Sequence, residues 1–75
     1  MAKLTLRQIL ADNIRRYRKK TGVSQDDFAT HCGFHRTYIG SVERCERNVT
    51  LETLELFAKA IGVSVPQLLT KDGVK

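Results

Sequence analysis

The chain has 75 residues, a length that allows one domain with a modest core and nearly excludes an enzyme with a large cleft. Hydrophobic residues make up 41% and charged residues 28%, which is too apolar for a disordered chain and too interrupted by charge for a membrane span. The formal net charge of +5 arises in residues 1–20, which hold seven Lys or Arg and one Asp. Such a basic segment favours binding to a polyanion, with nucleic acid as the first candidate and an anionic membrane as the second. The same charges are also explained by solubility and by the favourable effect of cations at a helix C-terminus.

Helix start and stop signals are dense along the chain, and strand alternation is almost absent. The segment Thr5–Gln8 is a capping box, and Ser24, Thr50 and Ser64 are expected to cap later helices. The second helix is expected over about Gln25–Cys32 and the third over about Arg36–Arg44. In chain order, the helices are expected to begin near Thr5, Ser24, Arg36, Thr50 and Ser64, and glycines end three of them at Gly22, Gly33 and Gly62.

These signals predict an all-α protein with five short helices in a single domain over residues 1–75, in which residues 70–75 form a frayed tail. Apolar side chains recur at helical spacing and form one stripe on each of the longer helices. The expected core residues are Leu6, Leu10, Ile14, Tyr17, Phe28, Ala29, Cys32, Phe34, Ile39, Val42, Leu51, Leu54, Phe57, Ala58, Ile61, Leu68 and Leu69.

The cysteines and histidines do not indicate a chemical site. Cys32 and Cys45 are too few for a disulfide framework, and the first residues lack the apolar run of a signal peptide, so we expect a cytoplasmic protein with free thiols. His31 and His35 lie near both cysteines, but the spacing is not that of zinc ligands. We therefore expect no metal and no cofactor. A catalytic Ser/His/Asp grouping and a glycine-rich phosphate loop are also missing, so we expect no enzyme.

The segment 25–42 has the spacing of a helix-turn-helix, in which two helices meet across a short turn. Ala29 is small where the second helix of the motif approaches, and Gly33 allows the positive φ of a tight turn. Ile39 and Val42 then hold the third helix of the chain against the core. The motif predicts that the opposite face of that helix points outward, with Arg36, Thr37, Gly40, Ser41 and Arg44 on it.

Gly40 is informative because a glycine inside a helix costs about 1 kcal/mol relative to alanine. Together with Ser41 it would form a small outer patch, which would let the helix press closely against another surface. We therefore predict that Thr37, Gly40 and Ser41 are left uncovered by the rest of the chain.

The segment Ser24–Gly62 resembles the Xre/Cro-like helix-turn-helix repressors, which have a compact lambda-repressor-like fold. The run His35–Arg44, followed by Glu46–Asn48, is similar to the controller proteins of restriction–modification systems. The resemblance implies double-stranded DNA as a partner, with Gln25 on a phosphate, base edges read by Arg36, Thr37 and Ser41, and Tyr38 at the groove edge. It also places Arg47 and Asn48 on the DNA backbone, and His35 and Arg44 among the DNA-facing residues.

Alternatives remain open at several of these positions. Arg44 can instead pair with a nearby carboxylate, Tyr38 can be partly packed surface, and His35 can be the N-cap of its helix. Cys45 stands where the family often has Gly, so we expect the recognition helix to close differently here, which leaves the placement of Arg47 and Asn48 open.

A small DNA reader gains affinity by pairing, because a dimer spans two half-sites. Leu56 lies off the apolar stripe of its helix, so we predict a C2 homodimer with Leu56, Ala60 and Val65 at its interface. The expected function is that of a sequence-specific transcription regulator, such as a restriction–modification controller, which binds a pseudo-palindromic operator. A phage-type repressor, an antitoxin, and a protein-interaction module that reads no DNA are the alternatives; RNA polymerase is left open as a further partner.

Overall fold

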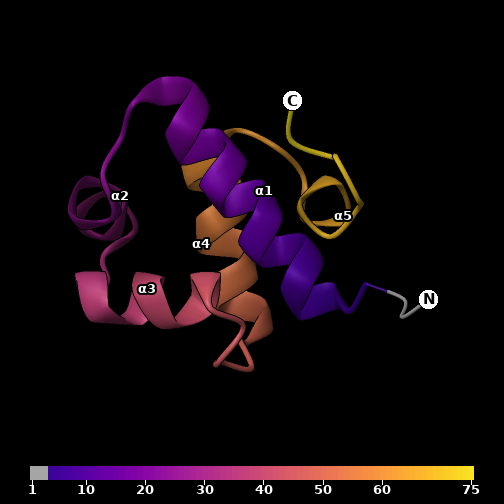
Figure 1. Ribbon diagram of the computed structural model, residues 1–75, viewed down its shortest axis with the longest axis horizontal. Helices are drawn as coiled ribbons and strands as arrows, with labels where there is room; N and C mark the ends of the chain where they lie inside the picture. The colour runs from indigo at the N-terminus through magenta and orange to yellow at the C-terminus, as the bar shows by residue number, and fades with distance from the viewer. Residues whose placement is uncertain (1–3) are drawn as a thin grey trace.

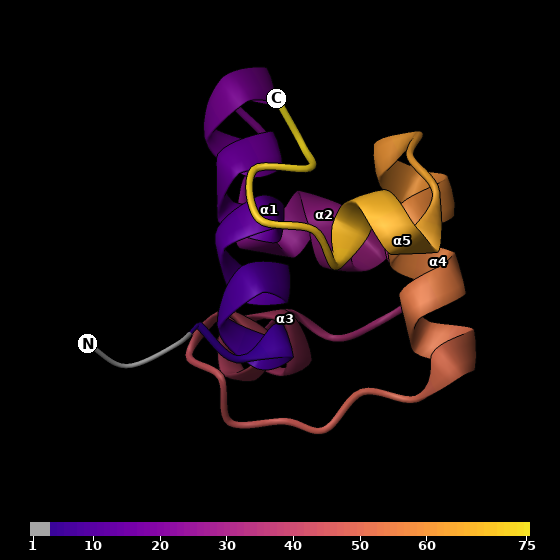
Figure 2. The same cartoon turned by 90° about the vertical axis from the view of Figure 1, so that its right-hand side faces the viewer.

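The computed structural model describes residues 4–75, and the regular structure in that range is entirely helical, as the sequence predicts. The helices are α1 (Leu6–Thr21), α2 (Gln25–Cys32), α3 (Arg36–Glu43), α4 (Leu51–Ile61) and α5 (Val65–Leu68). In Figure 1, α1 crosses in front of α4, with α2 and α3 on one side and α5 on the other, and Figure 2 shows the same packing from the side. None of these described helices is long and apolar enough to cross a membrane.

The predicted caps are confirmed, and they explain where the helices begin. Thr5 Oγ1 accepts a hydrogen bond from Gln8 N, and Gln8 Oε1 accepts one from Thr5 N, which completes the capping box of α1. A hydroxyl cap also opens α2, α4 and α5, at Ser24, Thr50 and Ser64. Each cap satisfies an amide that has no partner within its own helix.

Aromatic rings join the helices in the core. The ring centroids of Phe28 in α2 and Phe57 in α4 are 5.9 Å apart, and Tyr17 of α1 lies 5.8 Å from Phe28. Phe34, in the turn before α3, meets Phe57 edge-on at 5.6 Å. Offset and edge-to-face pairs at these distances stabilise beyond their buried area, so they fix the helix-turn-helix on α1 and α4.

Two residues of the predicted core, Leu6 and Leu51, are exposed. Each is the first residue of its helix, α1 or α4. The apolar stripe gave the correct face of the helix but not the point at which packing begins.

The structure corrects the prediction of a frayed tail over residues 70–75. Val74 is only 4% exposed and belongs to the core, while the buried Asn13 of α1 donates from Nδ2 to the carbonyl oxygens of Leu68 and Thr70 over 2.8 and 3.0 Å. Arg16 forms an ion pair with Asp72 at 2.6 Å. The end of α5 and the segment after it are therefore held along α1 by the buried Val74, by hydrogen bonds from Asn13 and Arg16, and by the Arg16–Asp72 ion pair.

Candidate nucleic-acid interface

The turn between α2 and α3 has the geometry that the sequence predicts. Gly33 adopts φ 82°, and the following amide, Phe34 N, donates to Ala29 O over 2.8 Å. His35 is the N-cap of α3, where its Nδ1 accepts from Thr37 N over 3.1 Å, which confirms the capping alternative for this residue. The ring is exposed at the start of the helix. The turn therefore sets the first residues of α3 outward, beside the first residue of α2.

A polar hollow of about 280 Å³ lies where α2 and α3 meet the surface. Arg36 and Thr37 are exposed on it, and no ion pair ties Arg36 to another residue of the described range. The residues that line the hollow are Gln25, Arg36, Thr37, Gly40 and Arg44. Four of these residues carry donor groups, and a guanidinium and a hydroxyl are the groups that read base edges in a major groove.

A buried acidic residue, Glu43, holds the two helices of the motif to α1. Its carboxylate accepts two hydrogen bonds from Arg18, over 2.6 and 2.7 Å, and a third from Gln25 Nε2 over 3.1 Å. Arg15 also donates to the backbone carbonyl of Glu43. The hydrogen bonds to Glu43 raise the pKa of Arg18, because they favour its charged form. Gln25 is thereby fixed at the edge of the hollow.

The prediction that Gly40 and Ser41 form an uncovered patch is wrong. Both are buried, and Ser41 is 6% exposed. A Cβ on Gly40 would lie 3.1 Å from Arg44 Nη1 and 3.7 Å from Gln25 Oε1, so two long side chains of the same surface cover the glycine. The missing side chain of Gly40 therefore leaves space for Arg44 and Gln25. Of the three residues predicted to be uncovered, Thr37, Gly40 and Ser41, only Thr37 is exposed.

Ser41 supports a second basic residue instead of facing outward. Its hydroxyl donates to Tyr38 O over 2.7 Å and accepts from Arg47 Nε over 3.2 Å. The guanidinium carbon of Arg47 lies 5.6 Å from the centroid of the Tyr38 ring, which itself packs on Phe34 at 4.9 Å. A stacked and hydrogen-bonded guanidinium loses little further freedom when it binds an anion. Tyr38 is half-buried, as its packed alternative predicts.

The turn after α3 contains a left-handed residue, Cys45. The expectation that the helix ends differently at this position is therefore wrong. Cys45 adopts φ 62°, and Glu46 N then donates to Ser41 O over 2.9 Å. A cysteine takes the conformation that glycine adopts more easily, because its own amide and that of Glu46 then donate to the carbonyls of Val42 and Ser41 in the last turn of α3. Arg47 and Asn48 follow this turn, and both are exposed.

Arg44, the residue after α3, pairs with a carboxylate, which was one of its two alternatives. Its Nε and Nη2 donate to the two oxygens of Glu46, over 3.1 and 3.2 Å. The hydrogen bonds to Glu46 raise the pKa of Arg44. Sequence reasoning did not single out Glu43, Arg18 or Glu46; a charged residue next to the buried Val42 was the available signal for Glu43.

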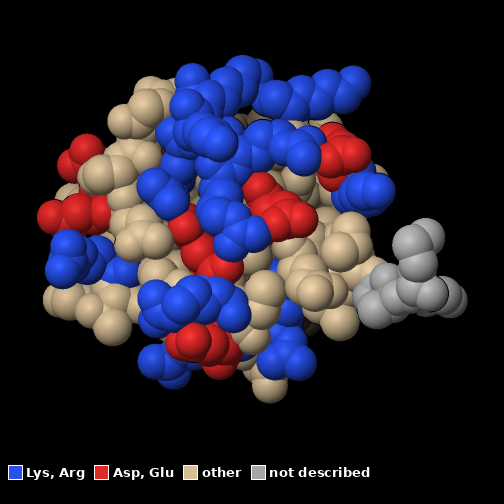
Figure 3. Space-filling view, in the orientation of Figure 1, with Lys and Arg blue, Asp and Glu red and all other residues tan. Residues whose placement is uncertain are grey.

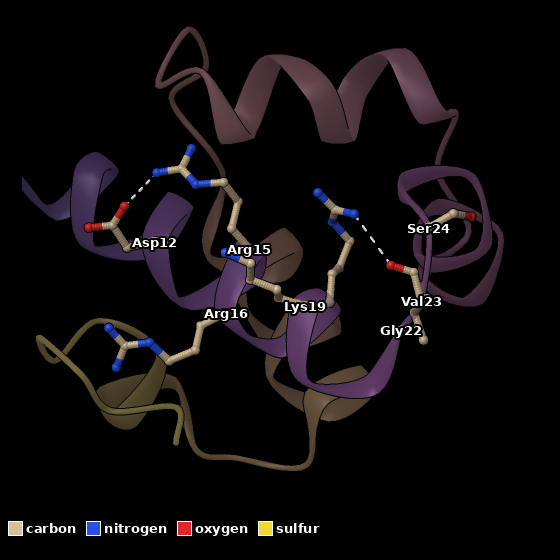
Figure 4. A pocket seen from close by; sticks show the side chains of 8 residues that line it. Asp12, Arg15, Arg16, Lys19, Gly22, Val23 and Ser24 are labelled. Atoms are coloured by element: carbon tan, nitrogen blue, oxygen red, sulfur yellow. Dashed lines mark hydrogen bonds and ion pairs between the residues drawn. The ribbon is translucent and has the colours of Figure 1, made fainter.

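Basic side chains gather over α1 in Figure 3, with acidic groups between them. A groove of about 650 Å³ runs beside this helix, and Figure 4 shows the side chains that line it. Much of its positive charge is used internally, because Arg15 pairs with Asp12, Arg16 with Asp72, and Arg18 with Glu43. The basic segment therefore serves the fold as well as the surface.

Leu56 is 45% exposed on α4, as its place off the apolar stripe predicts. It lines a hollow of about 280 Å³ together with His31, Cys32, Lys59 and Ala60. Ala60 and Val65 are half-buried and pack partly against the core.

Burial raises the pKa of the Cys32 thiol to about 11, so this group is neutral at physiological pH. Within residues 4–75 no group of three or more potential metal ligands comes together.

Comparison with known proteins agrees with this geometry. Residues 14–68 match the helix-turn-helix family model. The chain is 56% identical to control protein C.SmaI of Serratia marcescens over 72 residues, which cover 96% of this chain and 86% of that protein. It is 40% identical to control protein C.BamHI of Bacillus amyloliquefaciens over 65 residues, which cover 85% and 80% of the two chains.

A similar structure is the restriction–modification controller protein C.Esp1396I, solved as a tetramer in complex with its natural 35 base-pair operator. The TM-score is 0.78 at 33% sequence identity, and the match covers 97% of this chain and 100% of that one. Because the family model spans most of the chain and the relatives match nearly end to end, the protein belongs to the helix-turn-helix family of DNA-binding transcription regulators, among relatives that include restriction–modification controller proteins.

Proposed function

We propose that this protein is a restriction–modification controller that binds a pseudo-palindromic operator as a homodimer and thereby regulates transcription in the cytoplasm. The observation that carries the proposal is the polar hollow at the start of α2 and α3. There Arg36, which has no ion-pair partner within the described range, and Thr37 stand exposed beside Gln25. An unpaired guanidinium next to a hydroxyl and an amide matches the donor and acceptor pattern of a major groove.

The residues of this surface divide into two roles. Arg36 and Thr37 read base edges. Arg44 is a third base-contacting residue, through the guanidinium donors that do not bond to Glu46. Gln25, Asn48 and Arg47 set the register by contact with phosphates, and the stacking of Arg47 on Tyr38 supports its role. His35 caps α3 and is exposed directly before Arg36, on the same DNA-binding surface. Ser41 contributes through Arg47, to which it is hydrogen-bonded, and not by direct contact with a base.

Dimerisation is proposed through the exposed side of α4. Leu56 is an exposed large apolar side chain of this helix, and the hollow beside it, bordered by Ala60, can receive the Leu56 of a second copy. Val65 is half-exposed on the next helix. Sedimentation of Leu56→Asp should show monomer where the unchanged protein is dimeric. Leu51→Asp, which alters another exposed leucine of the same helix, should leave the dimer intact.

Selection from random duplexes at about physiological salt tests the DNA proposal. We expect enrichment of two inverted half-sites, with centres about one helical turn apart. The alternative function is a protein-interaction module, which the apolar exposure of Leu56 favours. It predicts no enriched sequence and no effect of Arg36→Ala.

A further inference from the structure

Arg44 lies back along α3 and does not project away from it. Its Nη1 stands 3.1 Å from the position that a Cβ on Gly40 would take, one turn earlier in the chain. Its Nε and Nη2 face the carboxylate of Glu46, at 3.1 and 3.2 Å. The helix backbone on one side and the carboxylate on the other therefore fix the plane of this guanidinium.

Glu46 reaches Arg44 because of the turn that ends the helix. The left-handed Cys45, with φ 62°, reverses the chain, and Glu46 N is then held by Ser41 O at 2.9 Å. Glu46 thus stands beside Arg44, which lines the polar hollow. This hydrogen bond places the backbone of Glu46 without help from the ion pair.

The stability of the fold does not account for this ion pair. The side chains of Arg44 and Glu46 are 59% and 56% exposed, and exposed pairs of this kind contribute little to stability. A carboxylate beside the DNA-facing surface also repels phosphates, which weakens binding to every sequence alike. A carboxylate that lowers the affinity for every sequence is useful at this position if it lowers the affinity for wrong sequences more than that for the operator.

The chemistry of the guanidinium shows how this discrimination would arise. Of its five N–H donors, Glu46 accepts one from Nε and one from Nη2. The end edge, formed by Nη1 and the remaining donor of Nη2, stays free. This edge is a planar fork that can bind O6 and N7 of guanine, and its value for recognition depends on a fixed orientation.

We propose that Glu46 is a positioning residue that determines sequence specificity. It presents the end edge of Arg44 to one base pair, and its negative charge penalises any duplex in which Arg44 finds no pair of acceptors to compensate. This inference rests on the proposed function, because it requires that α3 read a sequence.

The test compares Glu46→Gln with the unchanged protein on the selected operator and on a scrambled duplex of equal length, by fluorescence anisotropy at one salt concentration. We expect Glu46→Gln to tighten binding to the scrambled duplex but not to the operator, so that the ratio of the two affinities falls about tenfold. Asp72→Asn is the matched control. It removes the same charge and breaks another exposed Arg–carboxylate pair, on the segment after α5, and the ratio should not change.

A double-mutant cycle separates positioning from charge alone. If Glu46 acts through Arg44, the Glu46→Gln change should leave the affinity ratio unaltered in an Arg44→Ala background. The proposal is overturned if Glu46→Gln does not lower the ratio, if Asp72→Asn lowers it equally, or if the fall persists without Arg44. A ratio of one for the unchanged protein would overturn the proposed function as well, whereas a high ratio that is insensitive to Glu46 overturns this inference alone.

Discussion

Arg18 of α1 donates two hydrogen bonds to the carboxylate of Glu43 at the end of α3, over 2.6 and 2.7 Å. The side chain of Glu43 is 5% exposed and that of Arg18 is 19% exposed, so the pair is largely removed from water. The same carboxylate accepts from Gln25 of α2. One acidic group therefore joins three helices directly behind the proposed DNA-binding surface.

Replacement of this acid should be costly. Glu43→Gln keeps the shape but leaves the Arg18 guanidinium without its counter-charge, and we expect the free energy of unfolding to fall by about 2–3 kcal/mol. Urea denaturation measures the change. Asp12→Asn, which breaks the exposed pair with Arg15, should cost less than about 0.5 kcal/mol. Equal losses for the two variants would show that the buried pair does not hold α3 to α1.

Cys45→Gly should stabilise the protein. A non-glycine residue at φ 62° is strained by about 1–2 kcal/mol, and the greater freedom of glycine in the unfolded chain offsets part of that gain. We expect a net increase of about 0.5–1 kcal/mol in the urea unfolding free energy. Cys45→Ala keeps the Cβ and hence the strain, so an equal gain from alanine would contradict this explanation.

The stability of the protein should fall at alkaline pH through Cys32. The pKa of this thiol is raised by burial from 9.0 to about 11, so the unfolded chain ionises first as the pH rises. The contribution is fully present below about pH 9 and is lost progressively towards pH 11. Unfolding curves across this range should be less pH-dependent for Cys32→Ala than for the unchanged protein. Parallel curves would mean that the thiol titrates normally in the fold.

Arg36→Ala should weaken operator binding by roughly 1–3 kcal/mol and relax the preference at one base pair, because it removes a base contact. The measurement is affinity for the operator and for each single-base variant of the half-site. An equal loss on operator and random duplexes would assign Arg36 to the phosphates.

Arg47→Ala should act on all sequences alike. It removes a phosphate contact, so the slope of log affinity against log salt should flatten by about one unit. Ser41→Ala, which removes only the hydroxyl that holds Arg47 Nε, should weaken binding in the same sequence-independent way but keep the salt slope. A loss confined to the operator would place Arg47 on a base.

Local sequence patterns were sufficient to predict the five helices, their caps, the helix-turn-helix spacing and the exposure of Arg36 and Thr37. These features depend on residues within about four positions of one another, where helical periodicity and capping act. The packing of the helices was needed to show that Gln25 and Arg44 cover Gly40 and that Glu43 joins three helices. It also decided that residues 70–75 pack along α1, through Asn13 and Val74. Those contacts depend on how the helices pack and where long side chains end, which no local pattern specifies.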